Sequence, residues 1–200
     1  MCEKIIWTQI DPLFHGFQYL TDNDLIYYHL EYDSSGYDKP NNSRVFNYKK
    51  DLKYRHEKQW FYKQEAIKDF ANLLIKTPFE DNSLLLSAPT SKHRDSQLFD
   101  SRNDEVIKIV NSVINIPISF NLSIIKDMEP IHLQSGYRCP DNLRGLYEFT
   151  PFKDIPEVVY IVDDVITSGS HFVVWRDLIH ETHPDIKVRA YYLARTVNVR

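Results

Sequence analysis

Two adjacent carboxylates and a run of small hydroxylated residues lie close together in the last quarter of the chain. Asp163 and Asp164 end the apolar run VVYIV, and the segment 167–170 (TSGS) follows shortly after them. Hydroxyls and backbone amides at the start of a helix bind phosphate, and a glycine there lets the backbone approach the anion closely. Carboxylates repel phosphate and suit hydroxyl groups or a divalent cation instead. A ribose 5-phosphate supplies both kinds of group, so the pattern predicts a site for a phosphorylated sugar.

The segment IVDDVITSGS resembles the ribose-phosphate-binding signature of type I phosphoribosyltransferases, in which a strand, paired acids and a Thr/Ser/Gly loop occur in this order. The resemblance implies that Asp163 and Asp164 contact the ribose hydroxyls of phosphoribosyl pyrophosphate. It implies a 5-phosphate cradle formed by Thr167, Ser168, Gly169, Ser170 and His171. His171 departs from the family, which often has a second threonine at this position. The alternative interpretation is an ordinary strand-turn-helix with a solvated acidic turn.

A second polar turn follows the apolar run LLL in the segment LLLSAPTSKHR. This segment resembles the PVP-then-basic stretch of ComF-type proteins, a branch of the same superfamily, but continues as DSQLFDSR where those proteins carry RGFNQ. The resemblance implies a pyrophosphate-binding loop, in which amides and cations stabilise the leaving group. Its members would be Ala88, Thr90, Ser91, Lys92 and Arg94. The alternative is a basic turn exposed to solvent.

The segment QSGYRCPDNLRGLYEF is similar to a further stretch of the ComF-type branch, with different spacing. The similarity implies that Arg138, Asn142 and Arg144 order a loop over the ligand. An equally good interpretation is a turn that Asn and Arg stabilise through hydrogen bonds to the backbone. The final YYLART is similar to the last core strand of the superfamily, so the resemblance covers about residues 80 to 200.

The periodicity of apolar residues predicts the elements that position these motifs. Residues 67–74 and 106–114 have helical spacing, Thr77-Pro78 gives a stop, and a further helix follows the TSGS loop. The pattern predicts strands at SLLLS, residues 120–124, VVYIV and VRAYYLA. Strand and helix alternate from about residue 80 onward, which favours an α/β fold with a mostly parallel sheet flanked by helices. The region from 127 to 149 reads as irregular.

The first third of the chain has a different pattern. Tyr28, Leu30 and Tyr32 alternate with polar residues, as do Phe46 and Tyr48, and the turn-rich stretch DSSGYDKPNNS separates them. The pattern predicts a hairpin or small meander. We therefore expect a β-rich N-terminal region over 1–79, acting as a hood or docking element, and a phosphoribosyltransferase-like core over 80–200. In type I enzymes the hood usually determines which nucleophile meets the sugar.

Composition excludes several other classes of protein. A chain of 200 residues with a net charge of −4 suits one globular domain and argues against a protein that coats nucleic acid. Cys2 and Cys139 fit a reducing cytosol, and the N-terminus is a poor signal peptide, so we expect a soluble, cytoplasmic protein without a membrane segment. His180 and His183 lack the pattern of a zinc site. Trp7, like a hairpin tyrosine, is a packing residue or a platform for a base.

The resemblance implies transfer of ribose 5-phosphate to a nitrogen nucleophile with release of pyrophosphate, assisted by Mg²⁺. The ligand would carry the Mg²⁺, with Asp163 and Asp164 as the protein carboxylates within reach. No residue is singled out as the general base. One alternative is a catalytically weak sensor of a phosphoribosyl ligand, since some superfamily members are regulators. Another is an accessory subunit of a bacterial defence or competence complex that docks through its N-terminal region and meets nucleic acid only indirectly.

Overall fold

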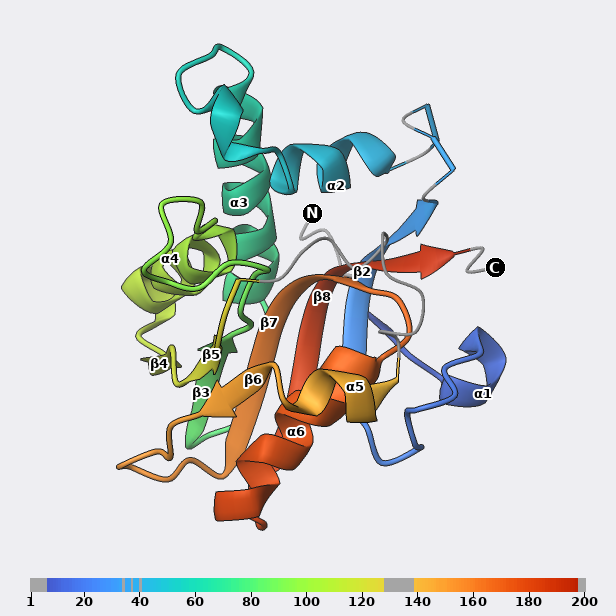
Figure 1. Cartoon of the computed structure of the whole chain (residues 1–200), viewed down its shortest axis with the longest axis vertical. Coiled ribbons are helices and arrows are strands. Elements are labelled where there is room, and N and C mark those ends of the chain that lie inside the picture. Colours follow the sequence, from blue (N-terminus) through green and yellow to red (C-terminus); the bar gives the residue numbers. More distant parts are fainter. Residues whose placement is uncertain (1–6, 34, 37, 40, 128–138, 198–200) are drawn as a thin grey trace.

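The computed structural model describes residues 7–127, except 34, 37 and 40, and residues 139–197. In this part of the chain a six-stranded sheet has the order β1-β2-β8-β7-β3-β4 (Figure 1). All neighbours in it are parallel except the edge pair β1–β2. Its strands are β1 (Thr8–Gln9), β2 (Ile26–Asp33), β3 (Ser83–Ser87), β4 (Ile118–Ser119), β7 (Val158–Ile166) and β8 (Lys187–Val197). The prediction of an α/β fold with a mostly parallel sheet is confirmed.

Helices cover both faces of the sheet. One apolar core lies between the sheet and α2, α3 and α4; a second lies between the sheet and α5, α6 and the small antiparallel sheet β5–β6 (Figure 1). The bounds are α2 (Asn42–Tyr48), α3 (Trp60–Ile75), α4 (Arg102–Ile114), α5 (Pro140–Arg144), α6 (Ser170–Thr182), β5 (Leu122–Ile124) and β6 (Tyr147–Phe149). The first five residues of β7 are buried because both faces of the strand are covered, which explains their continuous apolar run.

The hairpin predicted in the first third does not form. β2 pairs in parallel with β8 and antiparallel with β1, a two-residue strand that precedes the short helix α1 (Pro12–His15). Phe46 and Tyr48 belong to α2, in which the buried residues Val45 and Tyr48 have the spacing of one helix face. Two alternating aromatic residues are too short a pattern to distinguish the two periods. The N-terminal third thus adds two strands to the main sheet, and the separate roles of 1–79 and 80–200 stay a prediction.

Other predicted helices and strands are present in the structure, with changes at their ends. The helices predicted over 67–74 and 106–114 are α3 and α4, and the strands SLLLS, VVYIV and VRAYYLA are β3, β7 and β8. The region expected to be irregular contains α5 and β6. β7 does not end before the paired acids, because β8 is long enough to pair with it as far as Ile166. Among the described residues, no helix has both the length and the apolar character needed to cross a bilayer.

Candidate functional site at the carboxyl edge of the sheet

The paired acids extend beyond the end of the neighbouring strand. β3 ends at Ser87, which lies opposite Val162, whereas β7 continues through Asp163 and Asp164. On the β3 side the two acids therefore have no strand partner, while on the β8 side Asp163 pairs with Tyr192. Ligands of open parallel sheets bind at such a place, outside the carboxyl ends of the strands. The structure places the predicted ribose-binding residues where that rule puts a ligand.

Asp164 is buried and neutralised by two cations. Its Oδ2 accepts hydrogen bonds from Nε of Arg102 at 3.1 Å and from a terminal guanidinium nitrogen, and its Oδ1 lies 3.4 Å from Nζ of Lys49. The Val165 amide donates to Oδ1 at 2.6 Å. Burial alone would raise the pKa of Asp164, but Lys49 and Arg102 outweigh it and hold the pKa below its usual value. Asp164 is therefore a carboxylate at neutral pH.

Asp163 has a different environment. Its Oδ1 accepts a hydrogen bond of 3.1 Å from the side-chain amide of Asn103, which also donates to the Ala88 carbonyl at 3.1 Å. The Tyr48 hydroxyl donates to Asn103 Oδ1 at 2.9 Å, so Asn103 links α2, α4 and β7. Burial and the adjacent charge of Asp164 raise the pKa of Asp163 to about 7. The two acids thus differ in charge state near neutrality.

The loop after β7 has a left-handed turn that requires glycine. Gly169 has φ of 81°, and a Cβ atom there would lie 2.7 Å from Cγ of Leu20. The Thr167 hydroxyl is 3.0 Å from the hydroxyl of Thr196 on β8, and the hydroxyls of Ser168 and Ser170 are 2.9 Å apart. α6 begins at Ser170 directly after this turn. The predicted phosphate loop therefore combines hydroxyls with the amino end of a helix of 13 residues.

His171, the departure from the family pattern, is turned toward β6. Its Nδ1 lies 2.6 Å from the Tyr147 hydroxyl, and its ring packs against Trp175. Burial is the main cause that lowers the pKa of His171 to about 4, and the charge of Lys49 acts in the same direction. The side chain is therefore neutral at pH 7 and engaged away from the loop. Its backbone amide still belongs to the first turn of α6.

The structure divides the residues of the predicted pyrophosphate loop into two groups. Arg94 is committed to the protein: its guanidinium bonds the buried Asp104 carboxylate and lies over the rings of Phe99 and Phe120. Ser87 donates to the same carboxylate at 2.5 Å. The Arg94 side chain is therefore engaged within the protein, and a ligand that took it would leave a buried carboxylate unpaired, which is costly. Its role in binding pyrophosphate stays a prediction.

The other members of this loop differ in their engagement. The Ala88 amide donates to the Val162 carbonyl at 3.1 Å, and the Thr90 hydroxyl donates to the Asp100 carbonyl at 3.2 Å. Ser91 is exposed, and Lys92 lies 3.8 Å from the half-exposed Asp127, a weak pair. Among the described residues, Ser91 and Lys92 are thus the members of the predicted loop with the weakest contacts to the rest of the protein.

Sequence reasoning missed four residues of this edge: Tyr48, Lys49, Arg102 and Asn103. Arg102 and Asn103 begin α4, and the polar run SRND just before an apolar helix pattern was a signal for them. Arg102 also bonds Asp100 at 2.6 Å, and Asp100 in turn pairs at 2.7 Å with Lys63, a fully buried lysine. Nothing local in the sequence marks Tyr48 or Lys49, which reach the edge from α2.

Residues of the other predicted motifs lie away from this edge of the sheet or make contacts within the protein. Arg144 pairs with Glu181 near the C-terminal end of α6, and Asn142 lies exposed on α5. Arg138 lies outside the described residues, as does Cys2. Trp7 donates to the Thr77 hydroxyl at 2.9 Å and packs against Tyr191, which favours the packing interpretation. Within the described ranges, no group of three or more His, Cys, Asp or Glu side chains is arranged to hold a metal ion.

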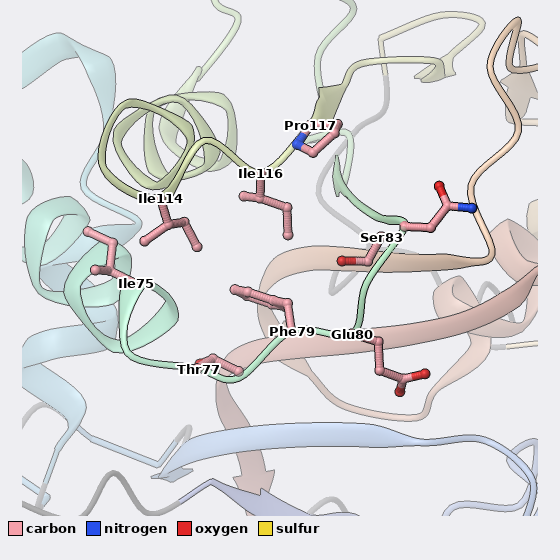
Figure 2. Close-up of a pocket in the computed structure, with 9 residues that line it drawn as sticks. Ile75, Thr77, Phe79, Glu80, Ser83, Ile114, Ile116 and Pro117 are labelled. Atoms are coloured by element: carbon pink, nitrogen blue, oxygen red, sulfur yellow. The ribbon is translucent and has the colours of Figure 1, made fainter.

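A hollow of about 470 Å³ lies at the opposite edge of the sheet, beside the first residue of β3 (Figure 2). Apolar side chains from the end of α3, the loop before β3 and the segment after α4 face its centre, among them Ile75, Phe79 and Ile116. The hydroxyl of Ser83 also points toward it. None of the predicted site residues lines this hollow.

No protein-family model matches this chain, and no curated protein matches it in sequence.

Proposed function

We propose that the protein binds phosphoribosyl pyrophosphate with Mg²⁺ at the carboxyl edge of the sheet and transfers ribose 5-phosphate to a nitrogen nucleophile. The observation that carries the proposal is the overhang of Asp163 and Asp164 past the end of β3, followed at once by the Gly169 turn and the start of α6. The carboxylates at one end of the segment 163–170 can accept hydrogen bonds from hydroxyl groups. The backbone amides at its other end, where α6 begins, can bind an anion.

Each part of the ligand would meet a different group of polar residues at this edge. The 5-phosphate would occupy the segment 167–170, which carries the hydroxyls of Thr167, Ser168 and Ser170 and leads into the first turn of α6. The ribose hydroxyls would meet Asp163 and Asp164. The pyrophosphate would lie toward the end of β3, near Ser91 and Lys92. The ligand would thus extend across the carboxyl ends of β7 and β3.

The residues present fit a Mg²⁺ ion that arrives with the ligand. Mg²⁺ usually keeps several waters and binds through one or two carboxylates plus phosphate oxygens of a substrate. Asp163 is the carboxylate that would hold it here, since Asp164 is already neutralised by Arg102 and Lys49. The ion would offset the charge that develops on the departing pyrophosphate.

In the reaction, the bond between the anomeric carbon and the pyrophosphate oxygen breaks and a bond to nitrogen forms at the same carbon. The electron pair of the broken bond leaves with the pyrophosphate, and the nucleophile loses its proton to solvent or to a group of the acceptor. The protein contributes orientation, by holding both ends of the ligand, and cations near the leaving group. Orientation of this kind alone lowers a barrier by several kcal/mol, on the order of 7 at best-aligned sites.

Isothermal titration with phosphoribosyl pyrophosphate and Mg²⁺ tests the proposal. We expect binding by the wild type and a loss of at least about tenfold in Asp163→Asn and in Ser168→Ala, since each removes a contact to the ligand. Thr182→Val, at the far exposed end of α6, is the matched control and should bind normally. Absence of binding by the wild type, or equal binding by all variants, would contradict the proposal.

The sensory alternative has one observation in its favour. Asp164 and Arg94 are both held in ion pairs within the protein, so groups that turnover would use are occupied before the ligand arrives. Pyrophosphate release, measured across a panel of nucleobases at a ligand concentration that saturates the wild type, separates the two functions. Release with any base supports the enzyme, and binding without release supports the sensor.

A further inference from the structure

The hydrogen-bonding capacity of Asp164 is fully used. A carboxylate has about four acceptor positions on its two oxygens. Nζ of Lys49 and the Val165 amide occupy Oδ1, while Nε and a terminal nitrogen of Arg102 occupy Oδ2. A ribose hydroxyl can bond to Asp164 only if one of these donors leaves.

The four donors differ in how easily they can leave. The Val165 amide is fixed by the backbone of β7, and Arg102 is held by two carboxylates, Asp164 and Asp100, with 13% of its side chain exposed. Among the described residues, the Lys49 ammonium has one polar partner, Asp164 at 3.4 Å, and 45% of the Lys49 side chain is exposed. A single long contact from a flexible, half-exposed lysine contributes little to stability. Lys49 is the donor that a ligand displaces most easily.

Lys49 also lies where an anion would bind. It extends from the end of α2, and its ammonium charge influences the side chain of His171 on the first turn of α6 as well as both acids of β7. The Lys49 ammonium bonds Asp164, which precedes the segment 167–170 by three residues, so an anion bound at that segment would lie close to it. A phosphate group carries more charge than one carboxylate and attracts an ammonium correspondingly more strongly.

We propose that Lys49 is an anion-binding residue that exchanges partners: a phosphate group of the ligand takes the ammonium from Asp164, and the freed Oδ1 then accepts a ribose hydroxyl. This inference rests on the proposed function and deepens it, because it makes sugar recognition depend on the phosphate. A ribose without phosphate leaves Lys49 on Asp164 and meets an occupied carboxylate. The site therefore selects phosphorylated sugars over free sugars.

The test compares Lys49→Met with Lys50→Met, its neighbour, whose side chain contacts Gln59 instead. Each protein is titrated with phosphoribosyl pyrophosphate, ribose 5-phosphate, inorganic pyrophosphate and free ribose, all with Mg²⁺. We expect Lys49→Met to lose about tenfold or more in affinity for the phosphorylated ligands that Lys49 contacts. Affinity for free ribose should stay equal or increase, because Asp164 has gained a free acceptor. Ribose 5-phosphate and inorganic pyrophosphate show which phosphate group takes the lysine.

A purely structural role of Lys49 predicts a different result, namely weaker binding of all four ligands together with a lower melting temperature. That result would overturn the inference, as would unchanged binding of phosphoribosyl pyrophosphate by Lys49→Met while the wild type binds it. If the wild type binds inorganic pyrophosphate but not phosphoribosyl pyrophosphate, and Lys49→Met binds neither, the proposed function fails and the anion-binding role of Lys49 stands. If the wild type binds none of the four ligands, both fail.

Discussion

The side-chain amide of Asn103 holds the Asp163 carboxylate at 3.1 Å and, with the same nitrogen, the Ala88 carbonyl at the end of β3. One buried residue at the start of α4 thus joins the ends of two parallel strands at the place where the ligand would enter. Its oxygen is in turn held by the Tyr48 hydroxyl of α2. The carboxyl edge is therefore positioned by side chains from helices on one face of the sheet.

Replacement of Asn103 should weaken both the fold and the site. Asn103→Ala leaves the Tyr48 hydroxyl, the Ala88 carbonyl and Asp163 without their partner, and each buried polar group so abandoned costs about 1–3 kcal/mol. We expect the free energy of unfolding in urea to fall by about 2–4 kcal/mol in total, given partial access of water. Gln97→Ala, at an exposed position of the loop before α4, is the control and should be neutral. A loss below about 0.5 kcal/mol in Asn103→Ala would contradict the structural role.

Asp163 should make the protein less stable as the pH rises toward neutrality. Its pKa of about 7 in the fold is above the ordinary value of 3.8, so the unfolded chain releases this proton at lower pH than the folded protein does. The contribution of Asp163 to stability is full below pH 4 and declines between about pH 4 and 7, by at most about 1.4 kcal/mol per pH unit. Asp163→Asn should remove this decline. Urea unfolding of both proteins at half-unit steps from pH 4 to 8 measures the difference, and parallel curves would contradict it.

His171 should act with the opposite sign over part of the same range. Its pKa of about 4 is below the ordinary 6.5, so the unfolded chain takes up this proton first as the pH falls. The neutral buried ring therefore costs stability progressively between about pH 6.5 and 4. His171→Gln, which keeps an acceptor for the Tyr147 hydroxyl but does not titrate, should lose this acid-side decline. The wild type shows the sum of two opposing slopes, so the single variants are needed to separate them. An unchanged acid-side decline in His171→Gln would show that another group causes it.

The sequence predicts the local elements of this chain better than it predicts their partners. β7 and α6 are identifiable because apolar run, acids, glycine turn and amphipathic helix follow one another within one continuous stretch. β2 was predicted as a strand, but its partner β8 begins more than 150 residues later, and no local pattern specifies such a pairing. α2 was misassigned because two alternating aromatics satisfy the strand period while Val45 and Tyr48 satisfy the helix period.

The same distinction applies to the site. The paired acids and the TSGS loop are adjacent in sequence, and their chemistry can be read from residue types. The partners of Asp164 come from α2 and α4, and Lys49 lies 115 residues away in the chain. Arg94 has the residue type and position of a phosphate ligand, yet it pairs with Asp104 in the first turn of α4. Which carboxylate a cation pairs with is decided by tertiary packing, which the motif does not encode.

Arg94 and Lys92 should respond differently to substitution, because Arg94 pairs with a buried carboxylate and Lys92 pairs with a half-exposed one. Arg94→Met leaves the buried Asp104 carboxylate with the Ser87 hydroxyl alone, and we expect a loss of about 2–4 kcal/mol in the free energy of unfolding. Lys92→Met should change stability by less than about 0.5 kcal/mol. Under the proposed function, Lys92→Met weakens the binding of phosphoribosyl pyrophosphate severalfold. Urea unfolding and titration of both variants provide the comparison, and equal effects on stability would contradict the division of roles.

Substitution by alanine should destabilise the protein more at Gly169 than at Gly16 or Gly145, for two separable reasons. Its φ of 81° strains an L-residue, and a Cβ atom would lie 2.7 Å from Cγ of Leu20. Gly16 has a similar φ of 72° with nothing within 4 Å, and Gly145 has neither the strain nor the contact. We expect Gly145→Ala to be nearly neutral, Gly16→Ala to cost about 1 kcal/mol through strain, and Gly169→Ala to cost about 2–4 kcal/mol through strain and overlap.

The overlap can be separated from the strain with a double-mutant cycle. Leu20→Ala removes the atoms that the new methyl group meets, so Gly169→Ala should cost only the strain, as at Gly16, when Leu20→Ala is already present. The interaction energy between the two sites should therefore be favourable by about 1–2 kcal/mol in urea unfolding. Additive effects would mean that the new methyl group at position 169 does not overlap Leu20. Because Leu20→Ala itself removes a buried core side chain, the double variant stays less stable than the wild type, and only the interaction energy reports the relief of the overlap.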